Sequence, residues 1–357
     1  MPHDRLCFFV DPSWRRSGYH IPLLNPFWGT MPLKNSPFVN DALTTYGFDP
    51  HWYAISNDVE KADVILLPYR YQTLLAQYPD ILGAALTVAG GSGKRVVIDA
   101  TGDIDYDISI PEAIILKYGG YRFLKKKNEI IIPLYADDLL ERFCGGVLTP
   151  RPKDLVLVVG FAGWAETSFP QRLYWRGKEI PLRFHAFFDD RYRAFRKGIF
   201  FRREALRQLT NAKEVRANVI TRPTYSGNVH TVAKDSGVVR GEFIENALAS
   251  DLCLDIRGDA NASTRLFEIL SLGRIPLIID TERNFPFSEQ LDYQSFSIII
   301  DFRDLENLPH LIRTKYDTIS EDQWIDMQER ARSAYRNWFR PDALTSHLVK
   351  ELRKHIF

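Results

Sequence analysis

The chain of 357 residues has little cysteine, and its three cysteines, Cys7, Cys144 and Cys253, lie far apart beside apolar or aromatic neighbours. An odd, scattered set of this kind fits neither a disulfide framework nor a zinc-binding motif, so we expect buried thiols in a reducing compartment. The N-terminus also lacks a basic segment followed by a long apolar stretch. These features predict a cytoplasmic protein.

The chain has almost no net charge, because 46 Lys and Arg are balanced by 45 Asp and Glu. A formal charge of +1 creates no global field that attracts nucleic acid or anionic lipid, so we expect no nucleic-acid partner. No apolar run approaches the roughly twenty residues of a membrane span, and no transmembrane segment is expected. Any bound anion must therefore be held by a local cluster of side chains.

Internal repeats and low-complexity tracts are missing as well, which excludes repeat architectures such as solenoids. Apolar residues make up 45% of the chain and charged residues 25%, the usage of a globular protein. A chain of 357 residues is too long for one ordinary core. The sequence therefore predicts two domains.

Short apolar runs alternate with longer amphipathic stretches, which is typical of parallel sheets with crossover helices. The expected strands of a first domain are 6–10, 64–67, 96–98 and 130–132. Those of a second domain are 155–159, 217–220, 252–254, 276–279 and 297–300.

A segment rich in Gly and Pro, 145–153, separates the two sets of strands and is typical of a linker. We predict a first domain over 1–150 and a second over 151–335. The remaining residues, 336–357, carry apolar residues at helical spacing, broken at Pro341. They predict a terminal helix able to pack back on the first domain.

The segment from Ser250 to Asp280 reads as strand, polar loop, helix, glycine turn and strand. Asn261 or Ser263 can cap the helix, and Gly273 can end it. The polar loop then lies at the carboxyl end of a strand and at the amino end of a helix. Free N–H groups and the helix dipole favour phosphate there, so a diphosphate fits without a metal.

Arg265 and Glu268 are three residues apart and share one face of this helix. Arg265, in the first turn, can bind two phosphate oxygens, and Glu268 can accept hydrogen bonds from a ribose diol. The alternative is a surface ion pair between the two, worth a few tenths of a kcal/mol.

Together with the stretch up to Ile300, this segment resembles the exostosin-like glycosyltransferases. The matching residues run in the family's order over about fifty positions: Ser263, Arg265, Glu268, Gly273, Ile275, Pro276, Ile278, Ile279, Pro286, Phe287, Leu291, Asp292, Tyr293, Phe296 and Ser297. Weaker likeness extends to 58–68, 127–133 and 155–160. Arg274 stands where the family often has Cys, and Asp255 to Arg257 replace its usual Pro or Lys, so the sugar is left open.

The resemblance implies an α/β fold of the GT-B type, with two Rossmann-like domains whose parallel sheets face each other across a cleft. It implies an inverting, metal-independent transferase without a cofactor. The donor, a nucleoside diphosphate sugar such as a UDP-sugar, would lie on the second domain. The acceptor, a hydroxyl of a glycan or glycoconjugate, would lie on the first.

Positive and hydroxyl groups around the loop are the predicted ligands of the donor phosphates. The residues we assign to this role are Arg257, Gly258, Ser263, Thr264 and Arg265. The neighbouring pair Arg202 and Arg203 is a second candidate, with a solvated basic helix face as the alternative.

Inversion also needs a general base to take the proton of the acceptor hydroxyl. Asp11 follows the first strand, while Asp99 and Asp103 follow the strand at 96–98. Asp103 best matches the acidic position that the family shows in this loop, and His20 is a further option. Each Asp has an ordinary alternative as a turn or helix cap.

Two other functions remain open on the sequence alone. A sugar-nucleotide epimerase has a similar two-domain architecture but needs acidic and His residues around the donor. A non-catalytic carbohydrate-binding relative of the family would have no nucleotide response.

Overall fold

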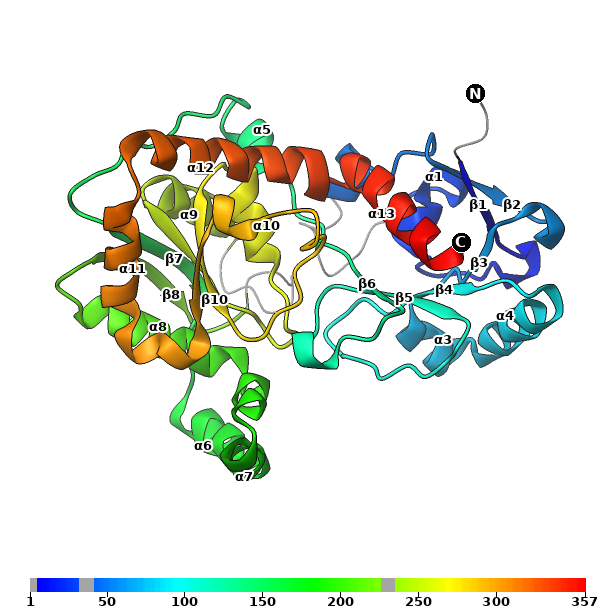
Figure 1. Ribbon diagram of the computed structural model, residues 1–357, viewed down its shortest axis with the longest axis horizontal. Coiled ribbons are helices and arrows are strands. Elements are labelled where there is room, and N and C mark those ends of the chain that lie inside the picture. The colour runs from blue at the N-terminus through cyan, green and yellow to red at the C-terminus, as the bar shows by residue number, and fades with distance from the viewer. Residues whose placement is uncertain (1–4, 32–41, 226–234) are drawn as a thin grey trace.

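The computed structural model describes residues 5–31, 42–225 and 235–357, which form two α/β domains placed end to end (Figure 1). Each domain is built on its own parallel sheet, and the two sheets share no strand. The predicted fold class, two Rossmann-like α/β domains in a GT-B arrangement, is confirmed.

The first sheet has six strands in the order β2-β1-β3-β4-β5-β6, all parallel. Its strands are β1 (Leu6–Phe9), β2 (Tyr53–Ser56), β3 (Val64–Leu66), β4 (Val96–Asp99), β5 (Ala113–Lys117) and β6 (Glu129–Ile131). Helices α1 (Asn25–Trp28), α3 (Tyr71–Gln77) and α4 (Pro79–Ser92) belong to the same domain. Strands β2 and β5 are not among those predicted from the sequence.

The second sheet has five strands in the order β11-β10-β9-β7-β8, also parallel. Its strands are β7 (Val158–Trp164), β8 (Arg216–Arg222), β9 (Leu252–Asp255), β10 (Ile275–Asp280) and β11 (Ile298–Asp301). Its principal helices are α8 (Gly198–Asn211), α9 (Ser236–Leu248), α10 (Thr264–Ser271), α11 (Leu308–Thr318) and α12 (Glu321–Ala334). The prediction of a strand starting at Leu155 is wrong, since Leu155 is 88% exposed and β7 begins three residues later.

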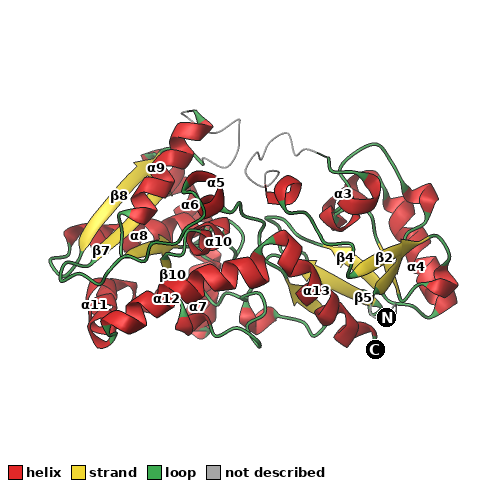
Figure 2. Cartoon of the chain, turned by 90° about the horizontal axis from the view of Figure 1, so that it is seen from above, coloured by secondary structure: helices red, strands yellow, loops and turns green. Residues whose placement is uncertain are grey.

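The terminal helix α13 (Pro341–Ile356) crosses back to the first domain, as Figure 2 shows. Its buried Leu344, Leu348 and Leu352 join the core that contains Leu6 and Phe8 of β1. Because α13 buries these side chains in the first domain, the C-terminal end of the chain stabilises the N-terminal sheet. Within the described ranges no helix is both long and apolar enough to span a bilayer.

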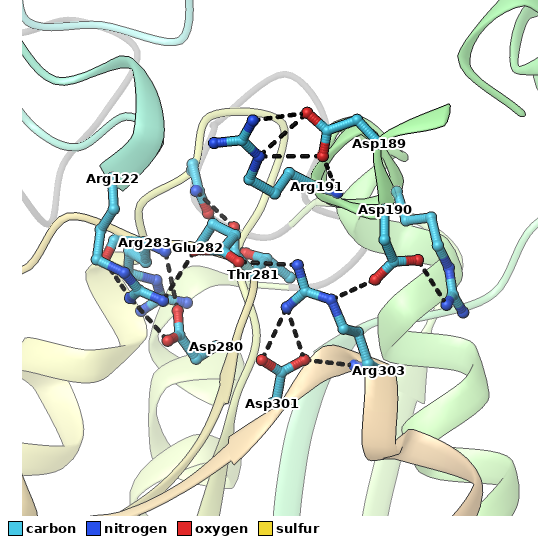
Figure 3. A network of polar contacts seen from close by, with 12 residues as sticks. Arg122, Asp189, Asp190, Arg191, Asp280, Thr281, Glu282, Arg283, Asp301 and Arg303 are labelled. Carbon is cyan, nitrogen blue, oxygen red and sulfur yellow. Dashed lines mark hydrogen bonds and ion pairs between the residues drawn. The ribbon is translucent and has the colours of Figure 1, made fainter. Parts of the chain in front are cut away.

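The domains are also joined by a polar connection, which lies near the start of the loop after β10 (Figure 3). Arg122 of the first domain contacts Asp280 Oδ2 at 2.7 Å and Glu282 Oε2 at 3.1 Å. Arg303 holds the other oxygen of Glu282 at 2.8 Å. Glu282 has a left-handed backbone conformation (φ 59°), which is uncommon outside glycine. Two guanidinium groups hold this tight turn from opposite sides.

Candidate functional site

The carboxyl ends of both sheets border one cavity of about 350 Å³. The first domain contributes residues that directly follow three adjacent strands: Gly102 and Asp103 after β4, Tyr118 after β5 and Leu134 after β6. The second domain contributes the ends of β7 and β8, the loop after β9 and the first turns of α10. This is the edge at which open parallel sheets bind ligands, and here two such edges meet.

The loop between β9 and α10 is positioned by Asn261 rather than by a capping bond. Ser263 is the N-cap residue, but its side chain makes no capping hydrogen bond. The Asn261 amide donates to the carbonyls of Gly120 (3.1 Å) and Thr281 (2.9 Å), and Thr281 Oγ1 donates to Asn261 Oδ1 at 2.7 Å. The first domain therefore holds this loop directly, through Gly120.

Gly119 leaves space for that contact, which gives a first prediction. A Cβ at Gly119 would overlap the Asn261 carbonyl and press on Ala262, so Gly119→Ala must displace the loop. Overpacking of this kind costs about 1–3 kcal/mol, and we expect a lower melting temperature and weaker ligand binding at the cavity. Calorimetric melting and ligand titration measure the two effects.

Gly83 provides the matched control, because a Cβ there would meet nothing within 4 Å. It lies exposed within α4, so Gly83→Ala is expected to be neutral or to stabilise by up to about 1 kcal/mol. Equal melting temperatures for the two variants would contradict the role assigned to Gly119.

Four arginines, Arg202, Arg222, Arg240 and Arg265, line the cavity. Arg222 pairs with Glu242 at 2.6 Å and Arg240 with Glu268 at 2.5 Å. The surface ion pair between Arg265 and Glu268, considered as an alternative above, is therefore not formed. Glu268 faces Arg240 instead.

Arg202 is a buried cation and Arg265 a half-buried one, and both donate hydrogen bonds to backbone carbonyls. Arg265 donates to the Ala162 carbonyl at 2.9 Å and stacks over Phe161, with 4.5 Å to the ring centroid. Arg202 donates to the Trp164 carbonyl at 2.6 Å. Within the described part of the chain neither forms an ion pair, and the Nε atom of each has no hydrogen-bond partner.

Burial lowers the pKa of both guanidinium groups, that of Arg202 to about 9, with the charge of Arg265 as its second cause. A buried cation without a counter-ion is unfavourable and gains most from a bound anion. This pair therefore favours an anionic ligand in the cavity.

The structure brings most of the predicted donor residues together in this cavity. Those in its lining are Arg202, Gly258, Ser263, Thr264, Arg265 and Glu268. The alternative of a solvated helix face does not hold for Arg202, which is 7% exposed.

Arg257 and Arg203 point elsewhere. Arg257 is 1% exposed and donates to the carbonyls of Ala194, Arg196, Gly258 and Asp259 behind the loop. Arg203 donates to Thr167 Oγ1 at 2.9 Å, outside the lining.

Among the predicted general bases, Asp103 is the residue in the cavity lining. It is exposed, and the pKa of Tyr225, across the cavity, is raised first by burial and then by the charges of Glu268 and Asp103. Asp103 of the first domain and Glu268 of the second therefore act on the same space.

The other candidates have local structural roles. Asp99 is 3% exposed and accepts from the Thr101 amide (2.9 Å) and hydroxyl (2.5 Å). Asp11 caps a short 3₁₀ turn by accepting from Ser13 N at 2.8 Å. His20 packs edge-on against Trp28, and burial lowers its pKa.

Several lining residues are not predicted from the sequence, among them Arg222, Arg240 and Tyr118. Arg222 and Tyr118 do carry a signal, because each lies at the carboxyl end of a strand. Arg240 lies inside α9 and is brought to the cavity by packing alone.

The sequence of residues 155–315 matches the family model of the Exostosin GT47 domain. This match supports the predicted resemblance of the second domain to the exostosin-like glycosyltransferases. An Exostosin-1 homolog of Caenorhabditis elegans is 30% identical over 118 residues, which cover 33% of this chain and 30% of that protein. A probable glycosyltransferase of Arabidopsis thaliana is 33% identical over 89 residues, or 25% of this chain and 16% of that one. The chain thus spans less than a third of the length of each of these relatives.

Two solved structures are similar to this chain at a low level. A glycosyltransferase from Rickettsia africae ESF-5 has 13% identity and a TM-score of 0.37, covering 83% of this chain and 77% of that one. Anabaena Alr3699/HepE in complex with UDP has 11% identity and a TM-score of 0.36, covering 98% and 100%. These likenesses are too low to add to what the two sheets show.

Proposed function

We propose that the protein is an inverting glycosyltransferase that moves a hexosyl or pentosyl group from a nucleoside diphosphate sugar, a UDP-sugar, to a hydroxyl of a glycan or glycoconjugate in polysaccharide biosynthesis. The observation that carries this proposal is the pair of buried Arg202 and half-buried Arg265, without carboxylate partners among the described residues, beside the amino end of α10. The pair lies in a cavity bordered by both domains and within an exostosin-like segment.

The residues divide the chemistry between the two domains. Arg265 and Arg202, with the N–H groups that open α10, stabilise the charge that develops on the leaving diphosphate. Glu268, which also pairs with Arg240, accepts hydrogen bonds from the ribose diol in this proposal. No cofactor takes part in this scheme.

Asp103 acts from the opposite side of the cavity. Its carboxylate takes the proton of the acceptor hydroxyl as that oxygen bonds to the anomeric carbon. The bond between this carbon and the diphosphate breaks on the far face, so the configuration inverts and the nucleoside diphosphate leaves.

Titration of the protein with UDP, GDP and a panel of their sugars, followed by thermal melting, tests the proposal. Binding to the folded state alone stabilises it by about 2.7 kcal/mol at a hundredfold excess over Kd. We expect stabilisation by one nucleotide sugar and slow hydrolysis of that sugar without acceptor. Release of a free epimer would instead support the epimerase, and no response to any nucleotide would support a non-catalytic relative.

Arg265→Ala and Glu268→Ala should each weaken donor binding without unfolding the protein. A hydrogen bond to a charged group contributes about 1.5–3 kcal/mol, so we expect Kd for the donor to rise by roughly 10-fold to 150-fold for Arg265→Ala. Isothermal titration measures this change. Arg203→Ala, outside the cavity lining, is the control and should retain affinity. Unchanged affinity in the Arg265 and Glu268 variants would contradict the assignment of the site.

Transfer should persist in excess chelator, because guanidinium and N–H groups here take the role that a divalent ion has in metal-dependent transferases. The measurement is product formation with and without EDTA after dialysis. A complete loss of activity that Mg²⁺ or Mn²⁺ restores would show this expectation to be wrong.

A further inference from the structure

A helical hairpin is inserted between β7 and α8 of the second domain. It consists of α6 (Phe169–Lys178), α7 (Ile180–Phe188) and the 3₁₀ turn Asp190–Phe195. Figure 1 shows α6 and α7 projecting away from the sheet, at the lower edge of the molecule. We refer to residues 169–195 as the aromatic hairpin.

The apolar stripe of α7 faces outward. Ile180, Phe184, Phe187 and Phe188 follow the i, i+4, i+7, i+8 spacing that normally marks the buried face of a helix. Their exposed fractions are 65%, 66%, 85% and 74%. No described part of the chain covers this face.

Helix α6 extends the apolar surface. Phe169, Leu173 and Tyr174 are 69%, 63% and 60% exposed. Monomeric proteins rarely expose large apolar side chains in one contiguous group, and such a group marks an interaction surface.

Around this surface, the exposed charged side chains that form no ion pair with a described residue are positive. Arg176, Lys178 and Arg183 are exposed, and none of the three forms an ion pair with another described residue. The acidic residues of the hairpin are already neutralised: Glu179 by Arg196, Asp189 by Arg191, and Asp190 by Arg193 and Arg303.

The base of the hairpin is fixed to the body of the second domain. Arg303 holds Asp190 at 2.5 Å while it also contacts Glu282 and Asp301 (Figure 3). Trp175 of α6 packs edge-on against Trp164, which lines the cavity. The hairpin is therefore fixed to the domain at its base, and this base lies next to the edge of the candidate site.

We propose that the aromatic hairpin binds the interface of an anionic lipid bilayer, with the α6 and α7 aromatics inserted and Arg176, Lys178 and Arg183 beside the lipid phosphates. Aromatic and aliphatic groups beside cations are the pattern of helices that lie in a membrane surface. The net charge of +1 leaves the whole chain without attraction to lipid, so this local cluster supplies it.

A second copy of the chain fits this surface less well than lipid does. In a twofold interface the same patch meets itself, so the cations of one hairpin would face those of the other. A bilayer that contains acidic lipid offers the opposite charge and a continuous apolar phase.

Co-sedimentation of the full chain with vesicles tests the proposal, independently of any sugar nucleotide. The comparison is between vesicles of phosphatidylcholine with about 30% phosphatidylglycerol and vesicles of pure phosphatidylcholine. Both are measured in about 0.1 M salt. We expect binding to the anionic vesicles at least about tenfold stronger than to the neutral ones, since each basic residue contributes roughly fivefold.

Two sets of variants separate the apolar and the charged contributions. The triple variant Phe184→Ser, Phe187→Ser and Phe188→Ser should lose at least about tenfold in binding to the anionic vesicles. Arg176→Glu with Arg183→Glu should lose binding to the anionic vesicles while the weak binding to neutral ones stays the same. Leu155→Ser with Val147→Ser removes side chains that are 88% and 74% exposed outside the hairpin, and should bind as the parent does.

Thermal melting checks that each variant folds, which the exposure of the changed residues leads us to expect. Failure of the parent protein to sediment with anionic vesicles would overturn the proposal, as would full binding by the triple phenylalanine variant. A concentration-dependent dimer that the triple variant abolishes would show that a second copy covers the hairpin, and would overturn it too.

Discussion

Asp103→Asn is expected to lower the turnover of donor sugar by about 10²-fold to 10⁴-fold with no change in donor affinity. General base catalysis contributes this much, and an amide cannot accept the proton of the attacking hydroxyl. Asp103 lines the cavity from the first domain and Arg265 from the second, so we expect Asp103 to make no contact with the donor phosphates. Release of nucleoside diphosphate measures turnover, with transfer to water where no acceptor is supplied.

Asp11→Asn and Asp99→Asn are the matched controls, because they make the same chemical change at the other two aspartates considered. Asp11 caps a 3₁₀ turn and Asp99 is bonded to Thr101, so their variants should affect stability more than turnover. A loss of turnover in the Asp99 or Asp11 variant with full activity in Asp103→Asn would move the general base to that residue.

The donor half of the site was predictable because its pattern is local in sequence. Strand, loop, helix and glycine turn follow one another between Ser250 and Asp280, and the structure has them as β9, α10 and β10. The turn at Gly273 has the left-handed φ of 63° that the sequence suggested. Local propensity and the buried pattern agree there, and agreement of this kind is what a sequence reveals.

The other half of the cavity depends on contacts between distant segments. Arg240 is brought to Glu268 by the packing of α9, and Asn261 is bonded to Gly120 across the domain interface. Neither pairing has a periodicity or spacing that a single sequence displays. The buried state of Arg202 was hidden for the same reason, since its partner carbonyl at Trp164 is 38 residues away.

The aromatic hairpin shows a different limit of what a sequence pattern predicts. The spacing of Ile180, Phe184, Phe187 and Phe188 indicates a helix with a buried face, yet the structure leaves that face exposed. An apolar stripe predicts that a helix is covered and does not say by what. Since no described residue covers this face, the stripe becomes a prediction about a partner.

Arg257→Ala is expected to destabilise the protein by about 3–5 kcal/mol rather than to act on donor binding alone. Its guanidinium is buried against four backbone carbonyls, and removing it leaves these acceptors without donors in a site closed to water. At about 2–4 °C per kcal/mol for a domain of this size, the melting temperature should fall by on the order of 10 °C. Calorimetry or circular dichroism at several temperatures measures the change.

The comparison with Arg265→Ala decides between two roles for Arg257. The Arg265 side chain borders the cavity, so its loss should weaken the donor while the melting temperature changes little. The Arg257 side chain lies behind the same loop, so its loss should lower the melting temperature first and affect the donor through the displaced loop. If Arg257→Ala melts like the parent and still fails to bind the nucleotide sugar, then Arg257 contacts the phosphates directly, as the sequence pattern had suggested.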